Sequence, residues 1–173
     1  WRTWRGGEID RFLRLDLAIF LGFSGGPLVD AGGRILGINT TGLTRGSGIA
    51  IPTSTVDRVT TALLEKGHVA RAYLGLGMMP IPLPEELTAR LKLPAATGMM
   101  VLTVEPSGPA HAAGALIGDV LVSLGGVAVS DMDDVHRALG AERVGQTVGA
   151  LVVRGGAPAE LAITLGDRSA ARG

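Results

Sequence analysis

The chain carries a serine set among glycines in the stretch Gly22-Phe23-Ser24-Gly25-Gly26-Pro27-Leu28-Val29. A nucleophilic serine needs such a backbone, because its hydroxyl must project into a cleft while neighbouring N–H groups converge on a developing oxyanion. Gly22 can adopt a backbone angle closed to other residues, and Gly25 and Gly26 have no side chains that would block a substrate. An ordinary glycine-rich turn before a strand is the plainer interpretation, and we favour the nucleophile.

The residues after Ser24 discriminate between two folds that carry a nucleophilic serine. The stretch also fits G-x-S-x-G, the motif in which an α/β-hydrolase places a helix directly after its serine. Here Leu28-Val29 is followed by the polar turn Asp30–Gly33 and by the apolar run Arg34–Thr40, which predicts a hairpin of two strands. No room is left for a helix, so the sequence favours a chymotrypsin-like double β-barrel.

Composition excludes several classes of function. The chain has 173 residues, no cysteine and no net charge, with 16 basic and 16 acidic residues. Without cysteine it forms no disulfide, thiolate metal site or cysteine nucleophile. Its charge balance and its 3% of aromatic residues provide no basic field and few side chains for base stacking, so we expect no nucleic-acid partner. The three histidines show no ligand spacing, and we expect no metal and no cofactor.

Around the hairpin, the sequence predicts further elements of a mainly β unit. We expect a strand over residues 9–19 and a short strand at Ile49–Ile51 that Pro52 stops. A helix follows, with Thr53 or Ser54 as its N-cap and Gly67 at its end. The apolar residues at helical spacing, which we expect to pack in a core, are Val56, Val59, Leu63 and Leu64.

A second unit of strands and short helices begins near Arg71. The expected strands are residues 73–79, 98–104, 119–124, 147–154 and 160–165. The expected helices are residues 85–93, 109–113 and 131–139, the last with Ser130 as its cap. Pro80, Pro82 and Pro84 are expected to break the first strand. Together these elements predict one small α/β domain.

Two motif sets resemble, in their order along the chain, the HtrA (Deg) family, which joins a trypsin-like protease domain to a PDZ domain. Residues 22–40 (GFSGGPLVDAGGRILGINT) resemble that family's nucleophile hairpin. Residues 71–76 resemble the carboxylate-binding loop of its PDZ domain, and residues 106–121 resemble a PDZ core signature. The resemblance implies a mainly β fold with some α-helix, in three parts. These are the second β-barrel half of a chymotrypsin-like protease domain over residues 1–70, a PDZ domain (α+β, a partly open β-barrel) over 71–167 and a tail over 168–173.

By this resemblance, Ser24 is the nucleophile of a serine endopeptidase that acts on unfolded or misfolded proteins. The family places its catalytic histidine and aspartate before the serine, and no histidine precedes Ser24 here. We therefore expect the chain to begin inside a longer protein and to be inactive alone, because an unactivated serine is a poor nucleophile. The alternative is a non-catalytic peptide-binding protein on a degenerate protease scaffold.

The resemblance also assigns residues to the protease site. The N–H groups of Gly22 and Ser24 would form the oxyanion hole, and Phe23 stands where the family usually has a polar residue. The substrate-binding positions that it implies are Ala18, Ile19, Phe20, Asn39, Thr40 and Thr41. Ala18 occupies the place where enzymes selective for Lys or Arg carry an acid. We therefore expect a small or branched apolar residue on the acyl side of the cut, because a pocket without an acid would not repay desolvating a cation.

In the PDZ region we expect an extended peptide to add as a strand between residues 74–79 and the helix over 131–139. Its terminal carboxylate would be held by N–H groups of the Tyr73–Gly75 loop, although simple core packing is the plainer interpretation of Tyr73 and Leu74. The expected peptide-binding residues are Tyr73, Leu74, Gly75, Leu76, Val135 and Leu139. The resemblance further implies polypeptide substrates and peptide C-termini as partners, assembly as a homotrimer, and a location outside the cytoplasm.

Overall fold

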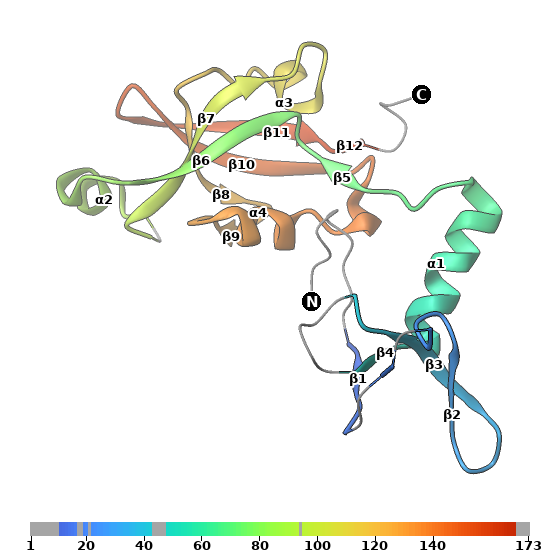
Figure 1. Ribbon diagram of the computed structural model, residues 1–173. Coiled ribbons are helices and arrows are strands. Elements are labelled where there is room, and N and C mark those ends of the chain that lie inside the picture. Colours follow the sequence, from blue (N-terminus) through green and yellow to red (C-terminus); the bar gives the residue numbers. More distant parts are fainter. Residues whose placement is uncertain (1–10, 17–18, 21, 43–47, 94, 169–173) are drawn as a thin grey trace. The chain divides into compact units, whose positions relative to one another are not determined.

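The structure is a computed structural model that describes residues 11–16, 19–20, 22–42, 48–93 and 95–168. The chain divides into two compact units, Trp1–Val69 and Ala70–Gly173 (Figure 1). We call them unit 1 and unit 2 and describe each by itself. All but the first residue of the tail predicted over 168–173 lies outside the described residues.

Unit 1 contains an antiparallel four-stranded sheet in the order β1-β4-β3-β2. Its strands are β1 (Leu13–Arg14), β2 (Pro27–Val29), β3 (Ile35–Thr40) and β4 (Ile49–Pro52). The predicted hairpin is confirmed as β2 and β3. Asp30 closes its turn by accepting hydrogen bonds from the N–H groups of Gly32 (2.8 Å) and Arg34 (3.0 Å). Within the described residues, this sheet is open and does not close into a barrel.

The strand predicted over residues 9–19 is found only at β1. Leu13 pairs with Ala50 and Arg14 with Ile49, and the N–H of the next residue, Leu15, donates to Gly48 O at 3.0 Å, just before the partner strand β4 begins. Residues 9–10 and 17–18 of the predicted strand lie outside the described residues.

The helix α1 (Thr53–Lys66) follows β4 and ends as predicted at Gly67, whose φ of 72° is left-handed. Its predicted N-cap is wrong. Pro52 occupies the capping position in an extended conformation, and Thr53 and Ser54 already lie inside the helix, so neither hydroxyl caps it.

The packing predicted for α1 is wrong at its C-terminal end. Leu63 is 46% exposed and Leu64 is 88% exposed, whereas Val56 and Val59 are half-buried. Helical spacing places such residues on neighbouring positions of one helix, but burial needs another element to cover them. In the described part of the chain, nothing covers Leu64.

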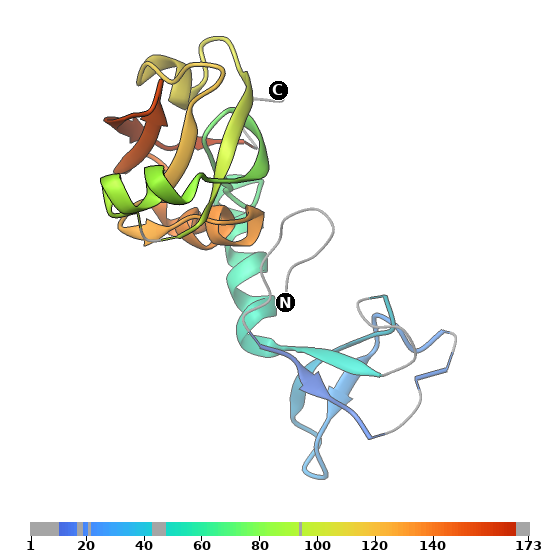
Figure 2. The same ribbon diagram turned by 90° about the vertical axis from the view of Figure 1, so that its left-hand side faces the viewer.

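Unit 2 is built on a larger antiparallel sheet with the order β11-β10-β8-β7-β6. Its strands are β6 (Leu76–Pro82), β7 (Thr97–Val104), β8 (Val120–Leu124), β10 (Thr147–Arg154) and β11 (Ala157–Thr164), with β9 (Val127–Ala128) paired to β8. A separate two-stranded sheet joins β5 (Ala72–Tyr73) to β12 (Gly166–Asp167). The helices are α2 (Glu85–Leu91), α3 (Pro109–Ala112), α4 (Met132–Ala138) and the 3-10 helix η1 (Ala141–Arg143). In both views, α3 (yellow) and α4 (orange) lie apart from one another in unit 2 (Figure 1, Figure 2), and both contribute to the same core cluster, through Ala110 and Val135.

The strand β6 continues to Pro82, although the sequence predicts that its prolines break it. β6 is an edge strand, paired on one side only, with β7. Proline is tolerated at such an edge because its nitrogen, which has no hydrogen, can face away from the neighbouring strand. The extended segment is interrupted instead at Leu74–Gly75, which separates β5 from β6.

The N-cap of α4 is Asp131 rather than the predicted Ser130, because the carboxylate of Asp131 accepts the N–H of Asp134 at 2.8 Å. Ser130 supports the same turn from outside, donating its N–H and its hydroxyl to Asp134 Oδ2 at 2.9 and 2.6 Å. The hydroxyl of Ser130, followed by its N–H, holds the pKa of the Asp134 carboxyl below its ordinary value.

The main core of unit 2 joins α4 and the sheet to the Tyr73–Gly75 loop. Buried strand residues such as Met99, Leu121 and Ile163 belong to the same cluster as Val135 of α4 and as Leu74. Removing such side chains from water is the main stabilising term, about 1.5–3 kcal/mol for each large apolar residue. Because Leu74 is part of this core, the loop is anchored to the body of the unit.

Candidate functional site

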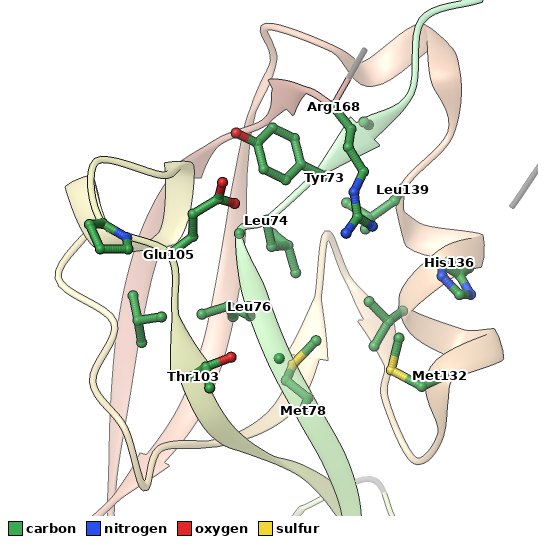
Figure 3. Close-up of a pocket in the computed structure, with 16 residues that line it drawn as sticks. Tyr73, Leu74, Leu76, Met78, Thr103, Glu105, Met132, His136, Leu139 and Arg168 are labelled. Atoms are coloured by element: carbon green, nitrogen blue, oxygen red, sulfur yellow. The ribbon is translucent and has the colours of Figure 1, made fainter. Parts of the chain in front are cut away.

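Unit 2 contains a groove between β6 and α4 with a cavity volume of about 450 Å³ (Figure 3). It is lined by Ala72–Met78, by Thr103–Pro106, and by Met132, Val135, His136, Leu139 and Arg168. The groove therefore lies along the free edge of an edge strand, which is the geometry required for adding another strand.

The Tyr73–Gly75 loop forms part of this groove. Gly75 has a φ of 75°, and a Cβ at this position would lie 3.3 Å from the side chain of Glu105. The carbonyls of Leu74 and Gly75 accept hydrogen bonds from the N–H groups of Ala110 and Glu105, both at 2.8 Å. Within the described residues, the N–H groups of Leu74 and Gly75 donate no hydrogen bond. Successive unused N–H groups are suited to holding an anion.

The walls of the groove are apolar. Leu74 and Val135 are 3% and 1% exposed, and Leu76 and Leu139 pack against the same core cluster. All the residues predicted to bind a peptide, including Tyr73, line this one cavity. Their role in binding stays a prediction.

Several residues of the groove were missed by the sequence prediction. They are Met78, Thr103, Glu105, Met132, His136 and Arg168. The spacing could have revealed three of them, because Met78 shares a strand face with Leu76, and Met132 lies three residues before Val135 and four before His136 on α4. The other three come from β7, from the turn after it and from the chain after β12, and no local pattern links these segments to the groove.

In unit 1, the serine loop is fixed to the end of β3. The N–H of Gly25 donates to Asn39 O at 2.8 Å, and the N–H of Asn39 donates to Gly26 O at 2.9 Å. The Ser24 hydroxyl lies 3.1 Å from the Thr41 hydroxyl and also accepts the N–H of Thr41 at 3.1 Å. Ser24 is exposed, so its hydroxyl is held in place and remains accessible.

The backbone around Ser24 has the freedom that the sequence predicts. Gly22 and Gly25 have φ values of 97° and 91°, and a Cβ at either position would meet no atom within 4 Å. In the described residues, the N–H groups of Gly22 and Ser24 donate no hydrogen bond. Their use as an oxyanion hole stays a prediction.

The predicted substrate-binding residues of unit 1 differ in their exposure and in their contacts. Ala18 lies outside the described residues. Ile19 is half-buried, whereas Phe20 is 72% exposed, as is its neighbour Phe23 at 61%. The side chain of Asn39 turns toward the hairpin, where its Nδ2 donates to Pro27 O at 3.3 Å and its Oδ1 is buried without a partner among the described residues.

Thr40 and Thr41 have different surroundings, although they are adjacent. The hydroxyl of Thr40 accepts the N–H of Gly42 at 3.1 Å, while that of Thr41 meets Ser24. The described residues place no histidine among the hydrogen-bond partners of Ser24 Oγ.

Comparison with known proteins identifies the family. A profile of the PDZ domain matches residues 35–165. The chain is 36% identical over 166 residues to the putative serine protease HhoB of Synechocystis sp., an alignment that covers 90% of the chain and 39% of that protein. It is 33% identical over 164 residues to a probable periplasmic serine endoprotease, DegP-like, of Brucella suis, covering 92% of the chain and 32% of that protein. The solved structure of the HtrA-type protease AlgW with a decapeptide superposes with a TM-score of 0.66 at 35% identity, covering 91% of the chain and 49% of that structure.

The chain belongs to the HtrA family of serine proteases. This HtrA-family chain spans less than two-fifths of the length of these curated relatives and about half of the solved structure. The family explains why a serine hairpin and a PDZ unit follow one another in one chain.

The described residues of this HtrA-family chain contain no group of three or more histidine, aspartate or glutamate side chains that could hold a metal ion. None of the helices among them is long and apolar enough to span a membrane.

Proposed function

We propose that unit 2 binds the C-terminal residues of polypeptides. The observation that carries this proposal is the groove along the free edge of β6, with unused N–H groups of Leu74 and Gly75 at the loop where β6 begins. A peptide adding to β6 gains main-chain hydrogen bonds, and its last side chain enters the apolar part formed by Leu76, Val135 and Leu139. The solved structure of the HtrA-type protease AlgW was determined with a decapeptide, which supports peptide binding as the function of this chain.

The experiment compares two forms of one peptide, a labelled decapeptide ending in leucine, with either a free carboxylate or a C-terminal amide. The free acid should bind with a micromolar dissociation constant, roughly −8 kcal/mol. The amide should bind more weakly, because it lacks the charge that the loop N–H groups would hold. Equal affinity for both forms, measured by fluorescence anisotropy, would show that this loop does not bind a carboxylate.

We further propose that unit 1 supplies the nucleophile of a serine endopeptidase that acts on unfolded or misfolded proteins. In this proposal Ser24 Oγ attacks the scissile carbonyl, a histidine supplied by a longer form of the protein accepts the serine proton, and the N–H groups of Gly22 and Ser24 stabilise the oxyanion. The family membership and the accessible serine support it. The present chain alone should be inactive, since no histidine is among the described hydrogen-bond partners of Ser24 Oγ.

A fluorophosphonate probe tests the second proposal. The full product of the gene should be labelled covalently, Ser24→Ala should abolish labelling, and the 173-residue chain should react little. An exposed serine elsewhere, Ser54, provides a matched control, because Ser54→Ala should leave labelling unchanged. Unlabelled but well-folded full-length protein would disprove the protease proposal.

A non-catalytic peptide-binding protein is the second candidate function. The observation that favours it is the hydrogen bond between the hydroxyls of Ser24 and Thr41, which occupies the serine without activating it. The same probe experiment separates the two candidates, since peptide binding without labelling is the result expected of this one.

Location, assembly and cleavage preference belong to the same proposal. We propose a location outside the cytoplasm, because the Brucella relative is described as a periplasmic protein, and a homotrimer, as the family resemblance implies. Cleavage would follow small or branched apolar residues.

A further inference from the structure

Among the described residues that line the groove, Arg168 is the one arginine or lysine. The other ionisable side chains that line it are Tyr73, Glu105 and His136. In Figure 3 the guanidinium of Arg168 points from the chain after β12 into the groove, which Leu139 also lines. In the described part of the chain it takes part in no ion pair, so its charge is available to a ligand.

The backbone of Arg168 is tied to the strand that leads into the Tyr73–Gly75 loop. β12 pairs with β5 through Gly166 with Tyr73 and Asp167 with Ala72, and the N–H of Arg168 then donates to Arg71 O at 2.9 Å. The N–H of Arg71 donates in turn to the carboxylate of Asp167 at 3.2 Å. This ladder keeps the base of the arginine at a fixed distance from the loop, so only the side chain has to adjust to a ligand.

The negative charge of Glu105, on the other side of the loop, would repel a peptide carboxylate, and a cation can offset this repulsion. Glu105 lies next to Gly75, since a Cβ on that glycine would be 3.3 Å from Glu105 Oε2. Backbone N–H groups alone would have to hold a carboxylate against this negative neighbour. A guanidinium opposite offsets the repulsion and can donate two parallel hydrogen bonds to a carboxylate.

We propose that Arg168 is a second carboxylate-binding group of this groove, acting with the N–H groups of Leu74 and Gly75. This inference rests on the proposed binding of peptide C-termini and specifies how the free terminus is selected. Arg168 makes the charge of the terminus, and not only its shape, a condition for tight binding.

The test uses the 173-residue chain with three substitutions and the acid and amide forms of the leucine-ended decapeptide. Arg168→Gln should lower the affinity for the free-acid peptide by about fivefold, the range of a partly exposed ion pair. It should leave the affinity for the amide unchanged. Arg168→Lys should retain most of the affinity, because it keeps the charge. Lys92→Gln removes an equal charge from an exposed residue that does not line the groove, and should change neither peptide's affinity.

Salt provides an independent measurement. The preference of the unsubstituted chain for the free acid should fall as ionic strength rises, and the preference of Arg168→Gln should fall less. Unchanged binding of the amide to Arg168→Gln also shows that the variant is folded.

Three results would overturn the inference, and they differ from one another. If the unsubstituted chain prefers the acid and Arg168→Gln prefers it equally, the loop binds the carboxylate without Arg168. If Arg168→Gln lowers the affinity for the acid and for the amide by the same factor, the arginine supports the groove only structurally. If the unsubstituted chain shows no preference, the proposed recognition of C-termini fails together with the role of Arg168.

Discussion

At the scale of single residues, Gly75 determines where the N–H groups of the groove point. Its left-handed φ turns the chain between β5 and β6, and its missing side chain leaves room for Glu105. Both requirements are met only by glycine, because other residues are strained at this angle and a Cβ would have to displace the glutamate.

Gly75→Ala should therefore lower the free energy of unfolding by about 1–2 kcal/mol, the usual cost of a strained backbone conformation. It should also lower the affinity for the free-acid peptide by about tenfold, because a misplaced N–H donor loses its hydrogen bond to the charged carboxylate. Thermal melting and anisotropy measure the two effects.

Gly149→Ala is the matched control for this prediction. Gly149 lies in β10 without a positive φ, and a Cβ there meets no atom within 4 Å. Its substitution should leave both stability and peptide affinity nearly unchanged. A Gly75→Ala variant that behaves like this control would contradict the account of the loop.

At the scale of elements, an ion pair between the buried carboxylate of Asp119 and the partly exposed Arg154 fastens the loop between α3 and β8 to the end of β10. Asp119, 1% exposed, accepts from Arg154 Nε and from its terminal nitrogen, both at 2.7 Å, and from the N–H of Leu116 at 2.9 Å. Arg154 also donates to Gly114 O at 2.8 Å. The hydrogen bond from Arg154 is the main reason why the pKa of Asp119 lies below its ordinary value.

Asp119→Asn should lower the free energy of unfolding by about 2 kcal/mol at neutral pH, since it removes charged hydrogen bonds from a buried site. Because the pKa is lowered in the folded protein, this contribution is complete above the unfolded value of about 3.9 and is lost as pH falls through the folded value. The stability difference between the two proteins should therefore shrink below about pH 4.

Glu160→Gln on the exposed face of β11 is the control for Asp119→Asn, and should change stability by less than about 0.5 kcal/mol. Denaturant unfolding at several pH values measures all three proteins. A difference that persists unchanged at low pH would mean that the carboxylate of Asp119 is not what stabilises the loop.

Elements were predictable from the sequence where their signals are local. The hairpin of β2 and β3 follows from alternation around a polar turn, and the end of α1 follows from Gly67. The persistence of β6 through its prolines could not be predicted, because edge position depends on which strands pair. The exposure of Leu64 could not be predicted either, since helical spacing does not say what covers a face.

The groove shows the same division. Its apolar walls were predictable from residues within β6 and α4, which local patterns identify. The position of Arg168 was not predictable. It reaches the groove because β12 pairs with β5, two short strands that lie near opposite ends of the unit 2 sequence. Such long-range pairing leaves no periodic signal in either segment.

At the scale of the whole molecule, the two units differ in how much apolar surface they bury. The described core of unit 1 contains Ile49, Ala50 and Pro52, whereas the other buried apolar residues lie in unit 2. Large apolar side chains are exposed in unit 1 at Phe12, Leu13, Phe20, Phe23, Val29, Ile35, Leu36, Leu63 and Leu64. Exposed surface of this kind promotes association.

The chain should therefore bind a hydrophobic dye such as anilinonaphthalene sulfonate, or self-associate, more than residues 70–168 alone. That shorter segment should fold and melt cooperatively, because it contains the main core and both of its sheets. Leu64→Ser should reduce dye fluorescence without changing the melting of unit 2. A monodisperse chain that leaves the dye dark would contradict this prediction.

The prolines of β6 also affect how readily this edge of the sheet can aggregate. Leu76, Met78, Pro80 and Pro82 alternate along the strand, so their nitrogens face one side, and a proline in a sheet turns that side toward the free edge. An open edge is a hazard, because any extended chain can add to it and begin an aggregate. Here an incoming chain finds donors only on the first half of the strand and then runs out of partners. A peptide can thus dock briefly by its end, while a growing fibre finds no continuous template.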